Sequence, residues 1–166
     1  MTQAIGRRSV LTAGVAGVGL TVLAPLRPAF AATSHDIEML NVHPENKRLR
    51  QVFFPRIHTV MPGDTVNFLA TDRGHNSATV EGMIPDGASG WDGKINEEVS
   101  ATLETPGFYG YQCTPHSSVG MVGLIIVSGD GMMDNLEAAQ GVRHRGKARA
   151  IWDEIWEEVA GMDLGS

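Results

Sequence analysis

The stretch FYGYQCTPHSSVGMVGLIIV, residues 108–127, decides the fold expected for this chain. Its two ends, FYGYQ and VGLIIV, are rich in aromatic and β-branched residues, which is typical of strands. Between them lies CTPHSSVGM (113–121), which reads as a tight connection between two adjacent strands. Upstream, residues 65–70 and 99–103 alternate between apolar and polar side chains and lie beside Pro-Gly turns. Several short strands separated by such turns indicate a β-sandwich.

The segments around these strands show other patterns. Residues 81–96 have no clear period, and we expect a long surface loop there. From Lys147 onward, apolar residues recur every four positions beside two tryptophans, which predicts an amphipathic helix that ends at Gly161. A shorter helix is expected before it, with Asp134 as its N-cap. Both helices must bury their apolar side chains, so we expect them to pack as a hairpin on the sandwich.

The N-terminal residues read as an export signal. They contain no acidic residue, carry two adjacent arginines before a mild apolar stretch, and end in an Ala-x-Ala cleavage pattern at Ala31. Arg7-Arg8-Ser9 resembles a twin-arginine signal, and an ordinary secretory signal is the alternative. Glycine and proline interrupt the apolar run, so membrane insertion is not expected. The expected parts are the cleaved signal at 1–31, the sandwich domain at 32–130 and the helical hairpin at 131–166.

Charge and cysteine content narrow the possible partners. Removal of the signal takes away three of the 13 basic residues, so 10 basic residues face 19 acidic ones, a formal charge of −9. Such a chain does not favour nucleic acid or anionic lipid as a partner. Cys113 is the single cysteine and cannot form an internal disulfide after export. It is therefore buried and inert, paired between chains, or occupied by a ligand.

The 113–121 loop brings together three potential metal ligands, Cys113, His116 and Met121. Thiolate, thioether and imidazole together select copper. Two imidazoles and one thiolate, with a weak axial thioether, make a blue-copper electron-transfer site. Because a tight connection brings its two ends close together, the three side chains can reach one ion. Pro115 stiffens the backbone just before His116.

A second imidazole has to come from elsewhere in the chain, and His75 is the best candidate. It follows Gly74, which allows the backbone to bend, and it precedes Asn76, which could hydrogen-bond across to the cysteine loop. The remaining histidines are expected to lie in polar loops, in the tail or on an outer strand face. They are His35, His43, His58 and His144.

Three stretches resemble the pseudoazurins, periplasmic members of the cupredoxin family. They are MPGDTVNFLATDRGHN (61–76), GMIPDGASGWDGKINEEVSATLETPGFYGYQCTPHSSVGMVGLIIVSGD (82–130) and NLEAAQGVRHRGKARAIWDEI (135–155). The resemblance implies an all-β fold, an eight-stranded Greek-key sandwich with one type 1 copper at one end and a two-helix C-terminal extension. It also implies the copper ligands His75, Cys113, His116 and Met121, with Asn76, Thr114 and Pro115 supporting them.

The function implied by this resemblance is that of a periplasmic electron carrier, a monomer that has no substrate chemistry of its own. His116 is expected to present its ring edge to solvent. The docking patch expected around it comprises Met83, Ile84, Pro85, Val119 and Arg73. Candidate partners are a copper nitrite reductase, a nitrous oxide reductase or a c-type cytochrome. Asp92 and Gln112 stand where the family often has lysine, so we expect the charge of the docking surface to differ from that of the family.

Two other functions would use the same residues. A hydrolase would use Cys113 as nucleophile with His75 or His116 as base. No helix N-terminus or basic cluster is expected beside this thiol to lower its pKa, however, and Met121 would have no role. A copper storage or delivery protein would have several Met or Cys ligands in an open site, whereas this loop indicates one closed site. We therefore predict an electron carrier and no enzyme.

Overall fold

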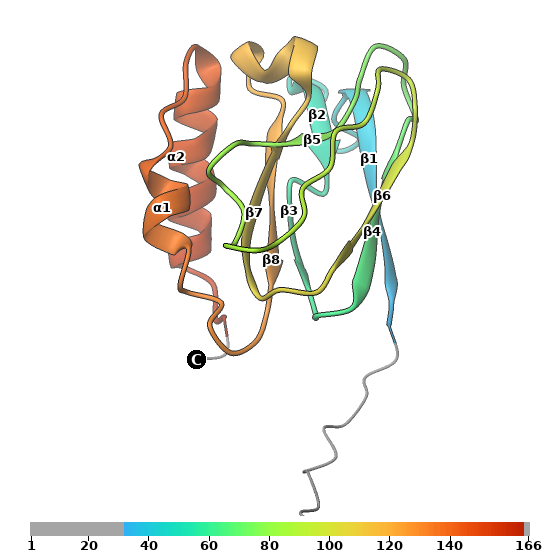
Figure 1. Ribbon diagram of the computed structural model, residues 1–166. Coiled ribbons are helices and arrows are strands. Elements are labelled where there is room, and N and C mark those ends of the chain that lie inside the picture. The colour runs from blue at the N-terminus through green and yellow to red at the C-terminus, as the bar shows by residue number, and fades with distance from the viewer. Residues whose placement is uncertain (1–31, 165–166) are drawn as a thin grey trace, which may run out of the picture. The chain divides into compact units, whose positions relative to one another are not determined.

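The computed structural model describes residues 32–164, and the predicted signal at 1–31 lies outside these residues. Eight strands form two four-stranded sheets that face each other (Figure 1). One sheet has the order β2-β1-β4-β6, with bounds Arg50–Phe54, Ser34–Val42, Asp64–Leu69 and Val99–Leu103. The other has the order β3-β8-β7-β5, with bounds Ile57–Val60, Val122–Val127, Gly107–Gln112 and Ala78–Thr79. The predicted eight-stranded sandwich is confirmed.

The core lies between the sheets and is built from alternating strand residues. Val66 and Phe68 of β4 point inward, as their alternation with polar residues predicts. The ring of Phe68 packs against Tyr111 of the opposite sheet at a centroid distance of 4.9 Å, and Phe53 contacts Tyr111 at 4.8 Å. Burial of these large rings between the sheets fixes how the two layers are placed on each other.

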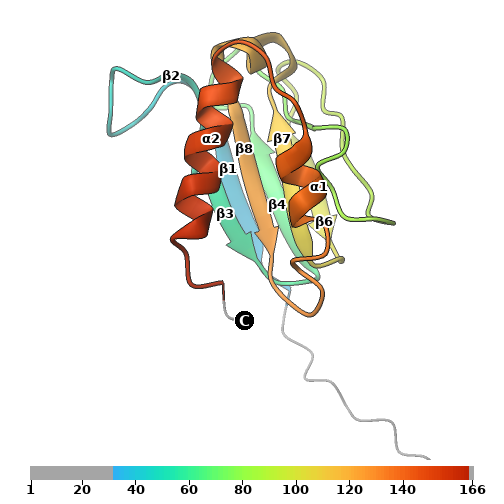
Figure 2. The same cartoon turned by 90° about the vertical axis from the view of Figure 1, so that its left-hand side faces the viewer.

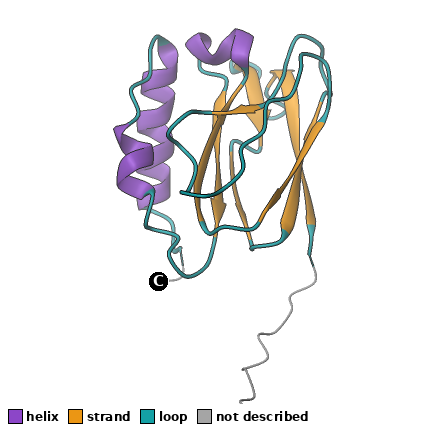
Figure 3. Cartoon of the chain, viewed as in Figure 1, coloured by secondary structure: helices purple, strands orange, loops and turns teal. Residues whose placement is uncertain are grey.

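Two helices cover the outer face of the β3-β8-β7-β5 sheet, as Figures 1 and 3 show. They are α1 (Leu136–Gly141) and α2 (Lys147–Ala160). Trp152 and Ile155 of α2 are buried in one cluster with Leu124 and Ile126 of β8. Strand β8 is therefore covered on both faces and all six of its residues are buried. The predicted second helix and its apolar stripe are confirmed.

The N-cap predicted for the first helix is wrong. Helix α1 begins one residue later, after Asn135 rather than after Asp134. Asn135 does not cap the helix with its side chain, because that side chain pairs with the backbone of Phe108 in β7. Its Nδ2 donates to the Phe108 carbonyl at 2.8 Å, and its Oδ1 accepts from the Phe108 N–H at 3.0 Å. Strand β5 pairs only with the other end of β7, so this asparagine provides hydrogen-bond partners for β7 where no strand lies beside it.

The sequence predicts a surface loop at 81–96. In the structure, this loop is anchored in the core by two buried side chains. Met83 is fully buried beneath Gly110, where an added Cβ would lie 2.7–2.8 Å from methionine side-chain atoms. Trp91 is also buried, and its indole Nε1 donates to the hydroxyl of Ser77 at 2.9 Å. Anchor residues spaced irregularly in a loop produce no periodic pattern, so the sequence did not reveal them.

Two further features of the fold are the length of its helices and the path of the chain between β1 and β2. Among residues 32–164, no helix is both long enough and apolar enough to span a lipid bilayer. The connection between β1 and β2 extends away from the sandwich beside α2, as Figure 2 shows.

Candidate metal centre

The predicted ligand loop joins β7 to β8 as a tight connection. Gln112 and Val122 form the last pair of the β7–β8 ladder, and one further bond runs from the Cys113 N–H to the Met121 carbonyl at 3.0 Å. A single 3₁₀ helix, η1 (Thr114–Val119), fills the loop between them. The Met121 N–H donates to the carbonyl of His116 at 3.1 Å. These bonds hold both ends of the loop at the same edge of the sandwich, as the sequence predicted.

His75 reaches the site from the connection between β4 and β5. The residue before it, Gly74, has φ +99°, a left-handed conformation that glycine adopts without strain. The bend is held by Asn96, whose Oδ1 accepts from the Gly74 N–H at 2.6 Å and whose own N–H donates to the His75 carbonyl at 2.8 Å. His75 is fully buried.

Three donor atoms converge from the two loops. Cys113 Sγ lies 3.8 Å from His75 Nδ1 and 3.5 Å from His116 Nδ1, and the two nitrogens are 3.2 Å apart. Within residues 32–164, these three side chains form a group of three His or Cys residues whose donor atoms all lie within 4.8 Å of one another, close enough to hold a metal ion. Donors bound to one ion through bonds of about 2.0–2.3 Å lie roughly 3–4 Å from one another. The three side chains therefore fit a single ion, and one thiolate with two imidazoles suits copper.

Asn41 of β1 orients the His75 ring, and sequence reasoning did not find it. The Oδ1 of Asn41 lies 3.1 Å from His75 Nε2. An amide oxygen only accepts, so the Nε2 of His75 carries the proton and its Nδ1 lone pair faces the other donors. Asn41 precedes His75 by 34 residues, and no local pattern marks it. Asp72 positions this strand end by accepting from the Asn41 N–H at 2.7 Å.

Burial keeps His75 neutral, which is the form that binds metal. Desolvation lowers the pKa of His75, the nearby His116 lowers it further, and Asp72 partly opposes both. Because a neutral imidazole has a lone pair at Nδ1, the ring is ready to act as a ligand without first losing a proton.

Asn76 joins the two ligand loops, as its position beside His75 predicted. Its Oδ1 accepts from the Thr114 N–H at 2.8 Å. Its Nδ2 donates to the Thr114 hydroxyl at 3.0 Å and to the Gly93 carbonyl at 2.9 Å. These three bonds connect the backbone on either side of the donor cluster and resist movement of one loop relative to the other.

Cys113 lies in surroundings that do not favour a free thiolate. The residue is fully buried, and burial raises the pKa of its thiol, while interactions with the N–H groups of Asn76 and His116 act in the opposite direction. A catalytic cysteine needs a lowered pKa and access to substrate. A thiol of raised pKa, held against two imidazole nitrogens, instead suits a ligand whose proton is displaced by a metal.

Part of the predicted docking patch is wrong. Met83 and Pro85 are buried and Ile84 is half-buried. Pro85 packs over Gly107, where an added Cβ would lie 2.5 Å from the proline Cγ. Gly107 is at the opposite end of β7 from Cys113, about 20 Å away at the usual rise of roughly 3.3 Å per residue. The segment holding these three residues therefore runs along the sheet and away from the site.

The structure leaves the other predicted surface residues exposed. Val119 in η1 is 48% exposed, and Arg73 is exposed two residues before His75. Pro115 and Thr114 are exposed as well.

The predicted ligand Met121 is fully buried in the same core cluster as Cys113.

Comparison with known proteins agrees with this geometry. Residues 38–128 match the family model of copper binding proteins of the plastocyanin/azurin family. The chain belongs to this family.

Within the family, the similarity over nearly the full length is to pseudoazurins, as the sequence resemblance predicted. The chain is 40% identical over 145 residues to the pseudoazurin of Paracoccus pantotrophus, covering 87% of this chain and 96% of that one. It is 34% identical over 152 residues to the pseudoazurin of Methylorubrum extorquens, covering 92% and 97%. A solved structure of a Sinorhizobium pseudoazurin is 43% identical, with a TM-score of 0.72, and the match covers 78% of this chain and 98% of that one.

Proposed function

We propose that this chain is a one-electron carrier that holds a single type 1 copper on His75, Cys113, His116 and Met121. The observation that carries the proposal is the convergence of one thiol sulfur and two imidazole nitrogens, 3.2–3.8 Å apart, from two separate loops. Copper in such a site supplies a couple between Cu(I) and Cu(II). Proteins of this family are electron carriers and not enzymes, and the buried Cys113 thiol agrees with that role.

The task of the surrounding residues is to keep the donors in place. Electron transfer is fast when the ligands hardly move between the two oxidation states, since movement adds to the barrier. Asn41 holds the ring of His75, and Asn76 holds the cysteine loop against the loop of His75. Bonds of this kind, made to the ligands rather than to the metal, orient the donors and tune the site. Met121, buried in the same core cluster as Cys113, would be the fourth and weakest ligand.

Electrons would enter and leave through His116. Cys113 and His75 are fully buried, whereas His116 is half-buried, so it is the converging donor with access to solvent. The exposed side chains of Pro115 and Val119 lie beside it in η1. A small apolar surface of this kind fits a weak, transient contact. Arg73 at the rim would steer a partner of opposite charge.

The candidate redox partners and the periplasmic location of this chain rest on its sequence rather than on its fold. The export signal predicted at 1–31 supports a periplasmic protein, and we expect it to act there as a monomer. A copper nitrite reductase, a nitrous oxide reductase and a c-type cytochrome are the candidate partners. Because acidic residues outnumber basic ones by 19 to 10 after residue 31, docking would depend more on the apolar contact at the exposed Val119 than on positive charge.

Absorption and EPR spectra of the chain with one equivalent of Cu(II) test the proposal. We expect an intense blue or green colour and narrow copper hyperfine splitting, both lost in Cys113→Ser. Ser117→Ala lies in the same loop and donates only to the Thr114 carbonyl, so it should keep both features. Copper binding without colour in the unaltered chain would overturn the assignment.

Met121→Gln tests the axial ligand separately. This substitution should keep the colour, because Cys113 and the two imidazoles remain, but shift the reduction potential and the relative band intensities. An unchanged spectrum together with an unchanged potential would show that Met121 is not a ligand.

A charge placed at Val119 tests the docking surface. Val119→Asp should slow electron transfer to a partner such as a copper nitrite reductase, while leaving the colour intact. Met133→Asp is the matched control, because Met133 is 51% exposed and lies beside α1, away from the ligand loops. Equal rates for the two variants would place docking elsewhere.

A further inference from the structure

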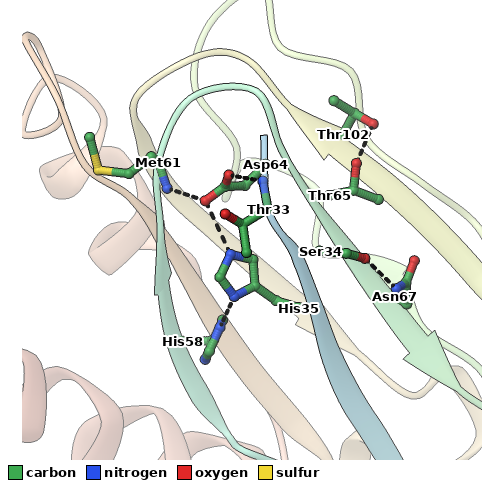
Figure 4. Close-up of polar contacts among 9 residues, drawn as sticks. All are labelled: Thr33, Ser34, His35, His58, Met61, Asp64, Thr65, Asn67 and Thr102. Carbon is green, nitrogen blue, oxygen red and sulfur yellow. Dashed lines mark hydrogen bonds and ion pairs between the residues drawn. The ribbon is translucent and has the colours of Figure 1, made fainter. Parts of the chain in front are cut away.

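A second pair of histidines lies at the end of the sandwich opposite to the ligand loops. His35 comes from β1 and His58 from β3, so the pair bridges the two sheets (Figure 4). His35 Nδ1 is 3.0 Å from His58 Nε2. The sequence-based prediction that both histidines face solvent is wrong. The side chain of His35 is only 22% exposed, and His58 points to the same face as the buried Val60.

Asp64 fixes the ring of His35 from the other side. Its Oδ2 lies 3.1 Å from His35 Nε2 (Figure 4). The carboxylate is held in place because it also accepts from the N–H groups of Thr33 at 2.7 Å and Met61 at 2.9 Å. These bonds lower the pKa of Asp64, so it is ionised at neutral pH. His35 must then donate from Nε2, which leaves the lone pair of Nδ1 directed at His58.

This arrangement is the one that proteins use to present a histidine to a metal. A ligating imidazole donates its other N–H to a carboxylate, which fixes the tautomer and raises the basicity of the ligating nitrogen. At bond lengths of about 2.0–2.1 Å, two nitrogens 3.0 Å apart subtend an angle of roughly 90–100° at one ion. That angle matches neighbouring positions of a tetragonal ion and is smaller than the tetrahedral angle of zinc.

We propose that His35 Nδ1 and His58 Nε2 form a second site for a divalent cation, Cu²⁺ above the others, with Asp64 as the positioning residue. Two imidazoles with water in the remaining positions favour Cu²⁺ most strongly among the common divalent ions. The contact with His35 Nδ1 places the single proton of neutral His58 on Nε2. Binding of the ion would require this proton to move to Nδ1, so that His58 Nε2 and His35 Nδ1 both present lone pairs. No sulfur donor is present, so the site binds copper without the intense thiolate colour.

The two sites are far enough apart to be measured independently. Asn41, which touches His75, lies six residues after His35 on β1. At roughly 3.3 Å per residue this places the two sites about 20 Å apart. The thiolate absorption therefore reports on the first site and on correct folding, whatever happens at the second.

The test is an EPR titration of the chain that already holds one equivalent of copper. A second equivalent of Cu²⁺ should add a signal with wide hyperfine splitting, and the narrow signal and the colour should remain. His35→Gln and His58→Gln should each remove the added signal and keep the colour. His43→Gln is the matched control and should keep both signals, because His43 lies on the loop after β1, where its Nδ1 accepts from backbone N–H groups.

Asp64→Asn separates a built site from two histidines that happen to be close. Loss of the positioning carboxylate should weaken the second copper by about 10–100-fold, measured by competition with a chelator. A second signal that survives in both His35→Gln and His58→Gln, or that is lost in His43→Gln, would overturn the proposal. So would the absence of any second bound copper, or equal affinity in Asp64→Asn.

Discussion

The two ends of the sandwich carry histidine pairs of almost the same geometry. At one end, His75 and His116 approach to 3.2 Å, and at the other His35 and His58 approach to 3.0 Å. In each pair one ring is oriented by an oxygen acceptor, Asn41 Oδ1 in the first and Asp64 Oδ2 in the second. The difference is the thiol of Cys113, which joins only the first pair.

This difference shows what a sulfur donor adds to a pair of imidazoles. Two imidazoles alone suit any divalent ion of borderline softness, and the ion keeps water as a ligand. A buried thiolate favours copper in both oxidation states and leaves little room for water. The two acceptors differ as well, because a neutral amide orients His75 whereas a carboxylate orients His35. The first site is therefore suited to electron transfer, and the second to simple binding.

Removal of His75 should have the largest effect. Loss of an orienting group weakens a metal site by about 10–100-fold, and loss of a ligand should exceed that range. We expect His75→Ala to lose the narrow EPR signal, while binding of the second copper stays unchanged. His58→Ala should show the opposite pattern. If His75→Ala kept the narrow signal, the first site would not need both of its imidazoles.

Removal of Asn41 should have the next largest effect. Without its Oδ1 the His75 ring is free to turn, so copper affinity in Asn41→Ala should fall by about 10–100-fold, while the colour is retained. Competition with a chelator measures the loss. Asn46→Ala is the matched control, because the side chain of Asn46 accepts from the Arg48 N–H on the same loop and does not touch a ligand. Equal affinities in the two variants would show that Asn41 does not position the ring.

The bend before His75 should contribute a smaller, structural effect. Gly74 has φ +99°, so Gly74→Ala should lower the free energy of unfolding of the metal-free chain by about 1–2 kcal/mol. Urea unfolding measures this change. Gly141→Ala is the control, because its Cβ would meet no atom within 4 Å and the glycine ends a helix. Similar losses for both glycines would mean that the left-handed bend carries no strain.

His144, a histidine that belongs to neither pair, should give the smallest effect. His144 stacks on Trp152 at a ring-centroid distance of 5.0 Å, and burial lowers its pKa, opposed by Asp153. The unfolded chain takes up a proton at this histidine below about pH 6.5, while the folded chain resists it. Stability should therefore fall as the pH drops below that value.

His144→Gln should make this fall shallower between about pH 5 and pH 6.5. Thermal unfolding of the metal-free chain over that range measures the slope. His58 and His75 also have lowered pKa values, so part of the dependence should remain. A slope equal to that of the unaltered chain would show that His144 does not titrate on unfolding.

Sequence reasoning worked where neighbours in the chain are also neighbours in space. Cys113, His116 and Met121 are joined by one tight connection, and the covalent chain itself holds them together. Alternation in β4 and the four-residue spacing in α2 were equally local, and both elements were found. His75 was found because a glycine marked a bend just before it.

Sequence reasoning failed where a partner lies far along the chain. Asn135 looked like part of a helix start, but its side chain pairs with Phe108, 27 residues earlier. Met83 looked like a surface residue because its loop has no period, and it is buried beneath β7. His35 looked solvated because it gains His58 as a neighbour only when the sheet of β1 packs against the sheet of β3.

The sequence by itself determined the sandwich, the helical cover and the kind of metal this chain binds. Strand and helix periods and the spacing of three potential ligands are properties of short segments, and their physical consequences are local. Only the tertiary structure decided which oxygen atoms orient the histidines, which predicted surface residues are buried, and that a second imidazole pair exists. Those features depend on contacts between residues 23 to 34 positions apart, which form only when the two sheets and their loops pack together.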